Sequence, residues 1–193
     1  MESKFTRSFF SIIFFCVFFT GYSLTYTVSN TTDAGAGSFR QAVIDANTNP
    51  GTDVIVFAVG AGAQTITLLS LVQVTTSINI DGTTQPGFSG TPLINIGGVS
   101  VFMINAVNTG TLQSMSFSTN ITSSAVRLVN SSNWLFTNNI MTGMNFGIEI
   151  QGNNTTHTLT LNNCSACNYG IYMNGGTNTS HLINNNNLSS CPQ

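Results

Sequence analysis

The fold is decided by three short stretches that share one pattern: Val126-Arg127-Leu128, Ile148-Glu149-Ile150 and Ile171-Tyr172-Met173. They follow one another at nearly constant spacing along the chain, and each has two aliphatic side chains around a charged residue or a tyrosine. A fixed period of roughly 20 to 50 residues indicates a repeat architecture, in which each repeat buries its apolar face against its neighbours. The same period predicts that Arg127, Glu149 and Tyr172 lie side by side.

Two further series follow this period. The first is apolar and recurs at the same nearly constant spacing: Phe117, Ile140, Cys164 and Leu188. The second consists of asparagine doublets just ahead of it: Asn138-Asn139, Asn162-Asn163 and Asn185-Asn186. In a parallel β-helix, equivalent strands of successive repeats stack about 4.8 Å apart. We therefore predict that the first series forms an inward-facing column and the second a corner ladder of amide hydrogen bonds.

Residues 1–23 have the pattern of a secretory signal peptide. Lys4 and Arg7 precede an apolar run from Phe9 to Phe19, and small residues stand at the −3 and −1 positions of a cleavage site after Ser23. A membrane-spanning helix is the alternative, but it needs about 20 apolar residues and this run is shorter. We therefore predict a secreted or cell-surface protein, with no stable membrane span once this segment is removed.

The rest of the chain is almost uncharged. Residues 24–193 contain two basic and five acidic residues, a formal charge of −3. A nucleic-acid footprint requires clustered Lys and Arg, so nucleic acid is not an expected partner. The chain is rich in Val, Ile, Thr and Phe, which favour strands, while Asn, Ser and Gly supply turns. This composition indicates a β-rich domain.

A single helical pattern precedes the repeats. Ser38 and Gln41 have the spacing of a capping box, and Asn49-Pro50-Gly51 ends the pattern. The apolar positions between them follow the spacing of an amphipathic helix: Phe39, Ala42, Val43 and Ala46. We predict that the helix from Phe39 to Asn47 caps the N-terminal end of the repeats, because an exposed strand edge recruits other chains unless it is covered.

Every other local signal is β. Turn residues separate short apolar runs that we interpret as strands: 26–28, 54–57, 65–69, 77–80 and 93–96. The predicted organisation is a signal peptide (1–23), an N-terminal cap with the first irregular repeats (24–100), and regular repeats with a period of about 23 to 24 (101–193). The fold class is all-β, a right-handed parallel β-helix (a solenoid) with one short capping helix. No cap follows Leu188, so either the tail alone shields the last repeat or the chain continues beyond Gln193.

The segment from Tyr26 to Thr91 resembles a recurring N-terminal module of bacterial secreted and surface parallel β-helix proteins. The matching pieces are 27–30, 35–47, 53–57 and 80–87. Residues 38–43 look like the Ser-Leu-Arg-(Glu/Gln)-Ala-Ile block of chlamydial-type polymorphic outer membrane proteins and other adhesin-like chains, with Phe39 in place of Leu. The resemblance implies the β-helix fold and an exported, surface-associated protein, and it implies no defined reaction.

Catalysis has little support among the residues. Glycoside hydrolysis generally needs two carboxyl groups about 5 to 10 Å apart. Five acidic residues are available in 24–193: Asp33, Asp45, Asp53, Asp81 and Glu149. They show no paired motif of the polygalacturonase type, so we predict no catalytic residue, no cofactor-binding residue and no metal site.

The stacked residues Arg127, Glu149 and Tyr172 allow two interpretations. The first is an exposed cross-strand ion pair between Arg127 and Glu149, worth about 0.2 to 1 kcal/mol. The second is a ligand-binding strip formed by all three side chains.

Three cysteines remain after residue 23. Cys164 falls in the apolar series, so we expect a buried thiol. Cys164 and Cys167 have C-x-x-C spacing, but a zinc site would need further ligands, and His157 and His181 are expected to stack elsewhere in the repeat. Cys167 and Cys191 lie one full period apart. Stacked cysteines of an exported protein could form a disulfide.

Two functions fit these patterns. The first is an exported, non-enzymatic, adhesin-like protein or passive cell-surface scaffold, with a surface glycan or a host or cell-surface protein as its partner. The alternative is a carbohydrate-binding or polysaccharide-degrading β-helix. This alternative needs a cleft lined by at least two of four residues: Asp81, Arg127, Glu149 and Tyr172.

Overall fold

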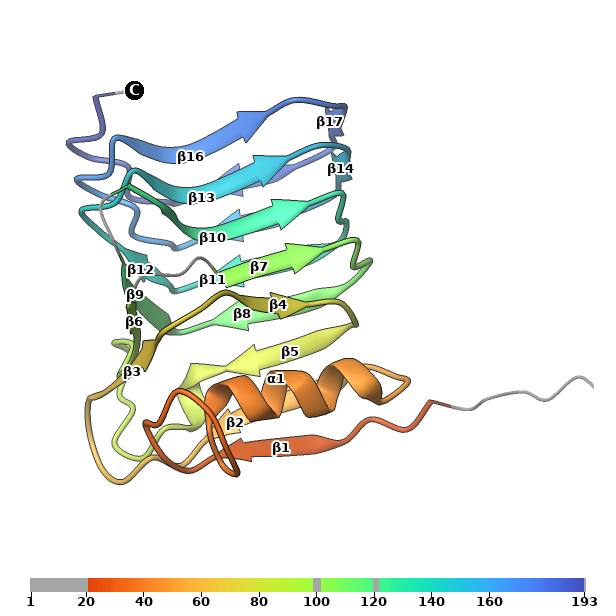
Figure 1. The fold of residues 1–193 in the computed structure, drawn as a ribbon. Helices are drawn as coiled ribbons and strands as arrows, with labels where there is room; N and C mark the ends of the chain where they lie inside the picture. The colour runs from red at the N-terminus through yellow and green to blue at the C-terminus, as the bar shows by residue number, and fades with distance from the viewer. Residues whose placement is uncertain (1–20, 99–101, 120–121, 193) are drawn as a thin grey trace, which may run out of the picture.

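The computed structural model describes residues 21–98, 102–119 and 122–192. The predicted signal peptide lies almost entirely outside them. The described chain contains one α-helix, α1 (Phe39–Thr48), a short 3₁₀ helix, η1 (Gly82–Thr84), and many short strands (Figure 1). The predicted all-β class is therefore confirmed.

The strands form three main sheets in which all pairs are parallel. The seven-stranded sheet pairs, in order, β1 (Thr25–Val28), β2 (Asp53–Phe57), β5 (Ile78–Asp81), β8 (Gly110–Gln113), β11 (Trp134–Thr137), β15 (Thr158–Thr160) and β18 (Leu182–Asn184). The five-stranded sheet pairs β4 (Val72–Val74), β7 (Phe102–Asn105), β10 (Ser124–Val129), β13 (Phe146–Gln151) and β16 (Tyr169–Asn174). The four-stranded sheet pairs β3 (Gln64–Leu68), β6 (Ile94–Gly98), β9 (Met115–Thr119) and β12 (Ile140–Met141). A short fourth sheet pairs β14 (Asn154–Thr155) and β17 (Asn178–Thr179).

The chain visits the three main sheets in a fixed order. From β2 to β13 it passes through the seven-, four- and five-stranded sheets in turn. Each strand inside a sheet therefore pairs with its equivalents one repeat earlier and one repeat later, and the seven-stranded sheet runs along the whole described stack (Figure 1).

Alternation of apolar and polar residues explains these strands, because successive side chains of a strand point to opposite faces. In β2, buried residues alternate with half-buried ones. The register of the seven-stranded sheet joins the inward residues into a column: Ile55, Ile80, Leu112, Phe136 and Leu159. Each of these is at most 1% exposed. Burial of such a side chain stabilises a fold by about 1.5 to 3 kcal/mol, so the core is one continuous column between the sheets.

The register that the repeats predict in the five-stranded sheet is confirmed. Arg127 of β10 pairs with Glu149 of β13, and Glu149 pairs with Tyr172 of β16. The aliphatic residues on either side of them pair in the same way. The three polar side chains therefore come from adjacent strands.

The predicted apolar column is wrong at one position. Phe117 pairs with Met141 rather than with Ile140. Met141 is fully buried, whereas Ile140 is half-buried. A slip of one residue exchanges the core and outer faces of a strand. Since both side chains are apolar, spacing alone could not separate them. Cys164 is fully buried, as predicted.

The predicted asparagine ladder exists, with one change of register. Nδ2 of Asn139 donates to Oδ1 of Asn162 at 2.9 Å, and Nδ2 of Asn162 donates to Oδ1 of Asn186 at 2.9 Å. The doublet assignment is wrong in the middle repeat, where Asn163 lies outside this ladder and pairs with Asn187. The ladder passes hydrogen bonds from repeat to repeat in a buried corner.

The helix α1 lies within one residue of its predicted bounds. Oγ of Ser38 accepts the backbone N–H of Gln41 at 3.1 Å, as an N-cap does. The side chain of Gln41 donates to Asp45 at 2.8 Å, so only half of the predicted capping box forms. The buried face is the predicted one: Phe39, Ala42, Val43 and Ala46. Phe39 stacks against Phe57 with ring centroids 5.9 Å apart, which fixes the helix on the core.

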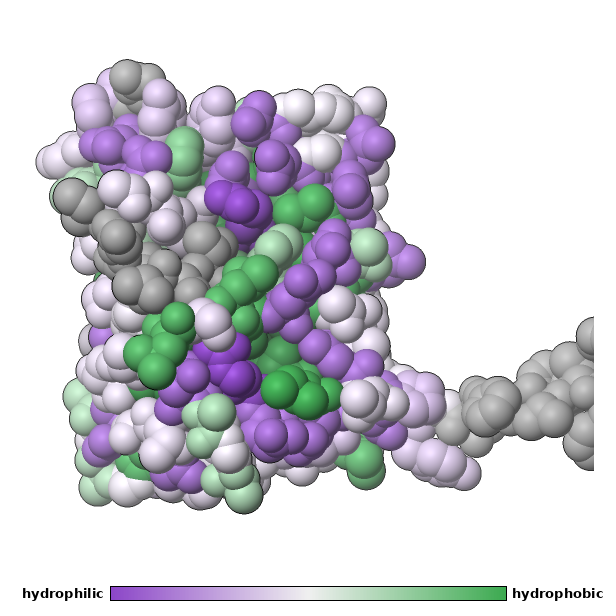
Figure 2. Space-filling model, viewed as in Figure 1, coloured by the Kyte–Doolittle hydropathy of each residue, from purple (hydrophilic) through white to green (hydrophobic). Residues whose placement is uncertain are grey.

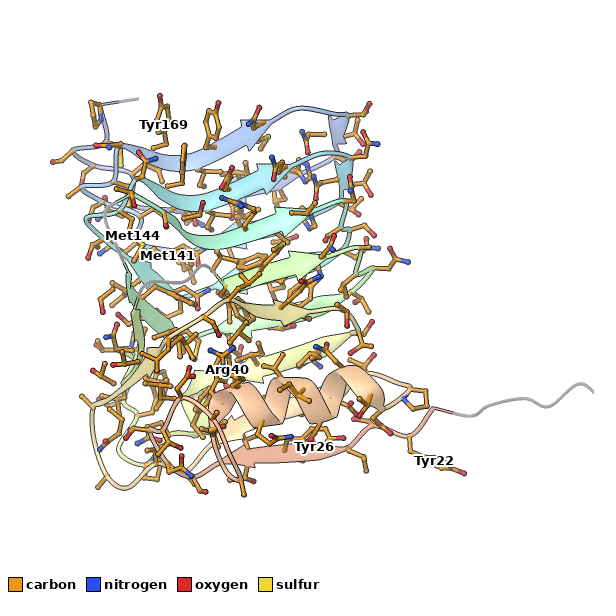
Figure 3. All side chains as sticks on the ribbon, viewed as in Figure 1. Tyr22, Tyr26, Arg40, Met141, Met144 and Tyr169 are labelled. Atoms are coloured by element: carbon orange, nitrogen blue, oxygen red, sulfur yellow. The ribbon has the colours of Figure 1, made fainter. Side chains whose placement is uncertain are left out.

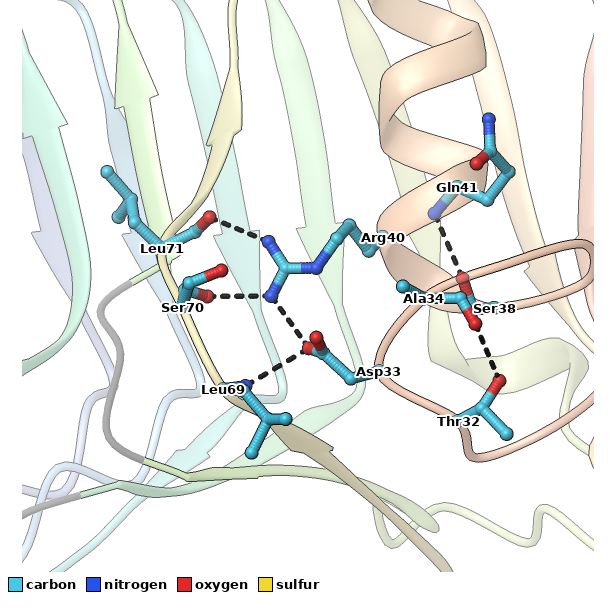
Figure 4. Close-up of polar contacts among 9 residues, drawn as sticks. All are labelled: Thr32, Asp33, Ala34, Ser38, Arg40, Gln41, Leu69, Ser70 and Leu71. Atoms are coloured by element: carbon cyan, nitrogen blue, oxygen red, sulfur yellow. Dashed lines mark hydrogen bonds and ion pairs between the residues drawn. The ribbon is translucent and has the colours of Figure 1, made fainter.

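Side chains near the start of α1 cover the segment that leads into β4 (Figure 4). Arg40 donates through Nη1 to the carbonyl of Leu71 and through Nη2 to that of Ser70, both at 2.8 Å. Asp33 accepts the N–H of Leu69 at 3.0 Å and pairs with Arg40 at 2.7 Å. Backbone groups at this end of the five-stranded sheet are thereby satisfied by side chains.

The other end of α1 covers β4 in the same manner. Asn47 donates to the carbonyl of Gln73 at 2.8 Å and accepts the N–H of Thr75 at 2.9 Å. β4 is the edge strand of its sheet. The helix and its side chains therefore stand where another strand would otherwise pair.

The opposite end of the stack has exposed inward-facing side chains. Leu188 follows Cys164 in its column and is 41% exposed, and Ile183 pairs with the fully buried Leu159 and is 40% exposed. β16 and β18 are edge strands of their sheets. Burial thus depends on a neighbouring repeat on both sides, as expected of a stacked architecture.

Candidate functional site

Two rows of side chains lie next to one another on the five-stranded sheet. The pairing of β10, β13 and β16 defines them: Ser124, Phe146 and Tyr169 in the first row, and Arg127, Glu149 and Tyr172 in the second. We call these six residues the outer-face cluster. The second row is the strip that the repeat predicts.

Small residues set the distance between the two rows. Ala125, which follows the first row, is fully buried. A Cβ atom at Gly147 would lie 2.9 Å from Cβ of Cys164, and one at Gly170 would lie 2.8 Å from Cδ2 of Leu188. Two successive residues therefore face the core, and the rows are three residues apart instead of two. This spacing brings the first row into contact with the second.

The polar half of the cluster consists of Ser124, Arg127 and Glu149. Nε of Arg127 lies 2.7 Å from Oε2 of Glu149, and the hydroxyl of Ser124 donates to the same oxygen. The predicted ion pair is confirmed, but the prediction that it is exposed is wrong for one partner. The side chain of Glu149 is only 6% exposed, whereas that of Arg127 is 33% exposed. Neighbouring side chains cover the carboxylate, which strengthens its interaction with the cation.

The aromatic half consists of Phe146, Tyr169 and Tyr172. Ring centroids lie 5.0 Å apart between Phe146 and Tyr169, 4.9 Å between Phe146 and Tyr172, and 4.8 Å between the two tyrosines. All three are half-buried. Figure 3 shows Tyr169 on the last strand of the sheet, at the C-terminal end of the stack. The rings form one packed surface beside the ion pair.

The sequence patterns did not identify Ser124, Phe146 and Tyr169 as site residues. A signal for the two rings was present, because Phe146 and Tyr169 are separated by the same interval as Glu149 and Tyr172. Contact between the rows could not be read from it, since regular alternation would place residues three apart on opposite faces.

The remaining predicted site residue, Asp81, lies elsewhere. It belongs to the seven-stranded sheet and lines a hollow of about 330 Å³ together with Asn79, Thr111 and Gln113. Its Oδ1 accepts both the N–H and the hydroxyl of Thr83, at 2.9 and 2.6 Å. The structure therefore brings together three of the four predicted residues.

Figure 2 views the molecule from the side of the five-stranded sheet, where hydrophobic and hydrophilic surface is intermixed.

The cysteines follow the predicted repeat. Burial raises the pKa of the Cys164 thiol to about 12. Sγ of Cys167 donates to the carbonyl of Met141, and Sγ of Cys191 donates to that of Cys164, both at 3.0 Å and one repeat apart. All three thiols are free in the structure. The disulfide between Cys167 and Cys191 stays a prediction for the oxidised protein. No group of three or more His, Cys, Asp or Glu in the described residues is arranged to hold a metal ion.

The predicted stack of two histidines is confirmed. The rings of His157 and His181 lie 5.0 Å apart at 7°. Nδ1 of His157 accepts the N–H of Trp134 at 3.2 Å, and Nδ1 of His181 accepts the N–H of His157 at 3.1 Å. His157 is fully buried, and burial together with the nearby His181 lowers its pKa to about 4. Both rings therefore act as neutral acceptors for the backbone of the preceding repeat.

No protein-family model matches the chain, and the search of curated proteins found no match. Among the described residues, no helix has the length and apolar character needed to cross a bilayer.

Proposed function

We propose that the protein is a right-handed parallel β-helix, that is, a solenoid. The support is the fixed order in which the chain passes through three parallel sheets, together with the residue columns that run along them. Right-handedness is the general rule for connections between parallel strands.

The proposed role is that of an exported, non-enzymatic β-helix protein, either adhesin-like or a passive cell-surface scaffold. The signal-peptide pattern of residues 1–23 and the resemblance of Tyr26 to Thr91 to bacterial surface β-helix proteins support export. The proposed partner is a surface glycan or a host or cell-surface protein. The formal charge of −3 in residues 24–193 does not suit nucleic acid.

One observation carries the binding role, namely the outer-face cluster. Its six side chains come from three neighbouring paired strands. Side chains on paired strands hold their positions better than side chains on loops. Aromatic rings beside a partly exposed guanidinium are also a composition that protein interfaces and ligand sites favour.

Polysaccharide cleavage is the second candidate, favoured by the meeting of Arg127, Glu149 and Tyr172. A glycosidase mechanism needs a second carboxyl group about 5 to 10 Å from the first. Asp81 lies on a different sheet, and its Oδ1 already accepts two hydrogen bonds. Glu149 itself is bonded to Arg127 and Ser124. These contacts favour binding over catalysis.

Two measurements test the proposal. Export is tested by mass spectrometry of the protein recovered from the medium or the cell surface. The exported chain is expected to begin at Leu24. Binding is tested by adhesion of the exported protein to cells, where the pair of changes Arg127→Ala and Tyr172→Ala is expected to reduce adhesion. Leu182→Ala is the control, because Leu182 is exposed in the last repeat but belongs to the seven-stranded sheet. Release of reducing ends from polysaccharides would overturn the non-enzymatic assignment.

A further inference from the structure

We propose that the outer-face cluster is a saccharide subsite that binds a pyranose ring of a neutral oligosaccharide. This inference rests on the proposed binding function and names the ligand class of its surface. Three features of the cluster support it: the arrangement of the rings, the donors beside them and the charge of the surrounding chain.

The three rings form a platform rather than a cage. Their centroids are 4.8 to 5.0 Å apart, so each ring contacts the other two. A cage for a quaternary ammonium group needs space between the rings, with the cation over their faces. Rings in mutual contact leave no such space. They are inclined to one another by 21° to 52° and are half-buried, so part of each ring remains accessible as apolar surface. The C–H groups on one face of a pyranose are a second apolar surface that can pack against it.

Polar groups border this platform. The Arg127 side chain is 33% exposed and uses Nε for Glu149, and within the described residues its two Nη groups have no partner. The hydroxyls of Tyr169 and Tyr172 likewise have no partner in that part of the chain. Sugar hydroxyls both donate and accept, so they can use a guanidinium and phenolic hydroxyls together. A mostly apolar surface with a few placed polar groups is the usual composition of a ligand site.

The charge of the region selects a neutral sugar. Arg127 and Glu149 are the only Asp, Glu, Lys or Arg residues between positions 82 and 193. They neutralise each other at 2.7 Å, so the side chains of this half of the protein carry no net formal charge to attract a uronate. A uronate carboxylate at the Nη groups of Arg127 would compete with Glu149 for the same guanidinium and would lose part of its hydration. A neutral oligosaccharide avoids this cost.

Titration calorimetry of the exported protein with three probes tests the proposal: cellohexaose, maltohexaose and hexagalacturonate. At least one neutral hexasaccharide is expected to bind, with hexagalacturonate at least about tenfold weaker. Tyr172→Ala and Tyr169→Ala are each expected to weaken binding about tenfold, equivalent to roughly 1.4 kcal/mol. Tyr172→Phe keeps the ring and is expected to bind within about threefold of the native protein, a difference of roughly 0.65 kcal/mol. Leu182→Ala is the matched control and should bind normally, and thermal melts report whether each variant folds.

Three results would overturn the subsite. They are failure of both neutral probes to bind, tighter binding of hexagalacturonate, and native affinity in a folded Tyr172→Ala variant. Failure here is distinguishable from failure of the proposed function. Adhesion to cells without hexasaccharide binding would reject the subsite alone, whereas loss of both would reject both.

Discussion

Nη2 of Arg40 lies 2.7 Å from Oδ1 of Asp33, and the pair binds the backbone leading into β4 at three points. Arg40 belongs to the segment that resembles a block of bacterial surface proteins. Its contacts give Arg40 a structural role in this chain, because they satisfy backbone groups where the five-stranded sheet begins.

Arg40→Ala is expected to lower the free energy of unfolding by about 2 to 3 kcal/mol, because the carbonyls of Ser70 and Leu71 lose a charged donor. Arg40→Lys should recover only part of this, since an ammonium group cannot reproduce the fork of the guanidinium. Urea unfolding measures both. Ile44→Ala is the control, because Ile44 is 47% exposed on the same helix. Equal loss in Arg40→Ala and Ile44→Ala would contradict the role assigned to Arg40.

The same pair predicts a dependence on acid. The hydrogen bond from Arg40 lowers the pKa of Asp33 below its usual value. A lowered carboxyl pKa stabilises the fold above the unfolded-state pKa, and that contribution is lost as pH falls through the folded-state value. Between about pH 4 and pH 2, the native protein should therefore lose more stability than Arg40→Ala does. Parallel curves for the two proteins would argue against this linkage.

The Arg127–Glu149 pair should respond unequally to the loss of its two partners. Arg127→Met leaves a carboxylate that is 6% exposed without its cation, whereas Glu149→Gln frees a guanidinium that already reaches solvent. We expect a cost of about 2 to 3 kcal/mol for Arg127→Met and about 1 kcal/mol for Glu149→Gln. Denaturant unfolding of both single variants and of the double variant measures the two costs. The same data give the coupling energy between the two residues, which we expect to exceed about 1 kcal/mol. The reverse order would show that Glu149 is solvated in solution.

His157 should make the protein less stable in mild acid. Its folded pKa of about 4 lies below the usual 6.5, so the unfolded chain binds the proton more readily. Stability is then complete above about pH 6.5 and falls as pH drops toward 4, by up to roughly 3 kcal/mol. The proton would occupy Nδ1, which accepts the N–H of Trp134. Urea midpoints between pH 4 and 8 test this, and His157→Gln should flatten the curve. A native titration near pH 6.5 by NMR would refute it.

The asparagine ladder should be sensitive to charge at its buried rung. Asn162 donates to the carbonyl of Phe136 at 3.0 Å and to Asn186 at 2.9 Å. Asn162→Asp removes both donors and places a carboxylate against the two acceptors, so we expect a loss of about 3 kcal/mol or more. Asn184→Asp, on the exposed β18, is expected to cost less than about 0.5 kcal/mol. Similar thermal melting temperatures for the two variants would mean that the ladder contributes little.

The repeat period predicted more of the fold than any motif did. It predicted the pairing of Arg127, Glu149 and Tyr172 and the stack of His157 on His181, because residues one repeat apart occupy equivalent strand positions. The period did not show which of Ile140 and Met141 faces the core, because these two neighbouring residues are both apolar. The period also did not show which asparagine of each doublet joins the ladder, because either of two adjacent asparagines satisfies a repeat spacing that varies by one residue.

The sequence by itself determined the helix α1, strands such as β2 and β5, and the alignment of Arg127 with Glu149 and Tyr172, but β4 lies outside the predicted strand ranges. These features follow from capping, alternation and repeat spacing, which are properties of short stretches of chain. Only the tertiary structure decided that Glu149 is covered and that Phe146 and Tyr169 join Tyr172. The physical reason is that two successive residues of each strand turn inward, and this packing brings together side chains that regular alternation would separate.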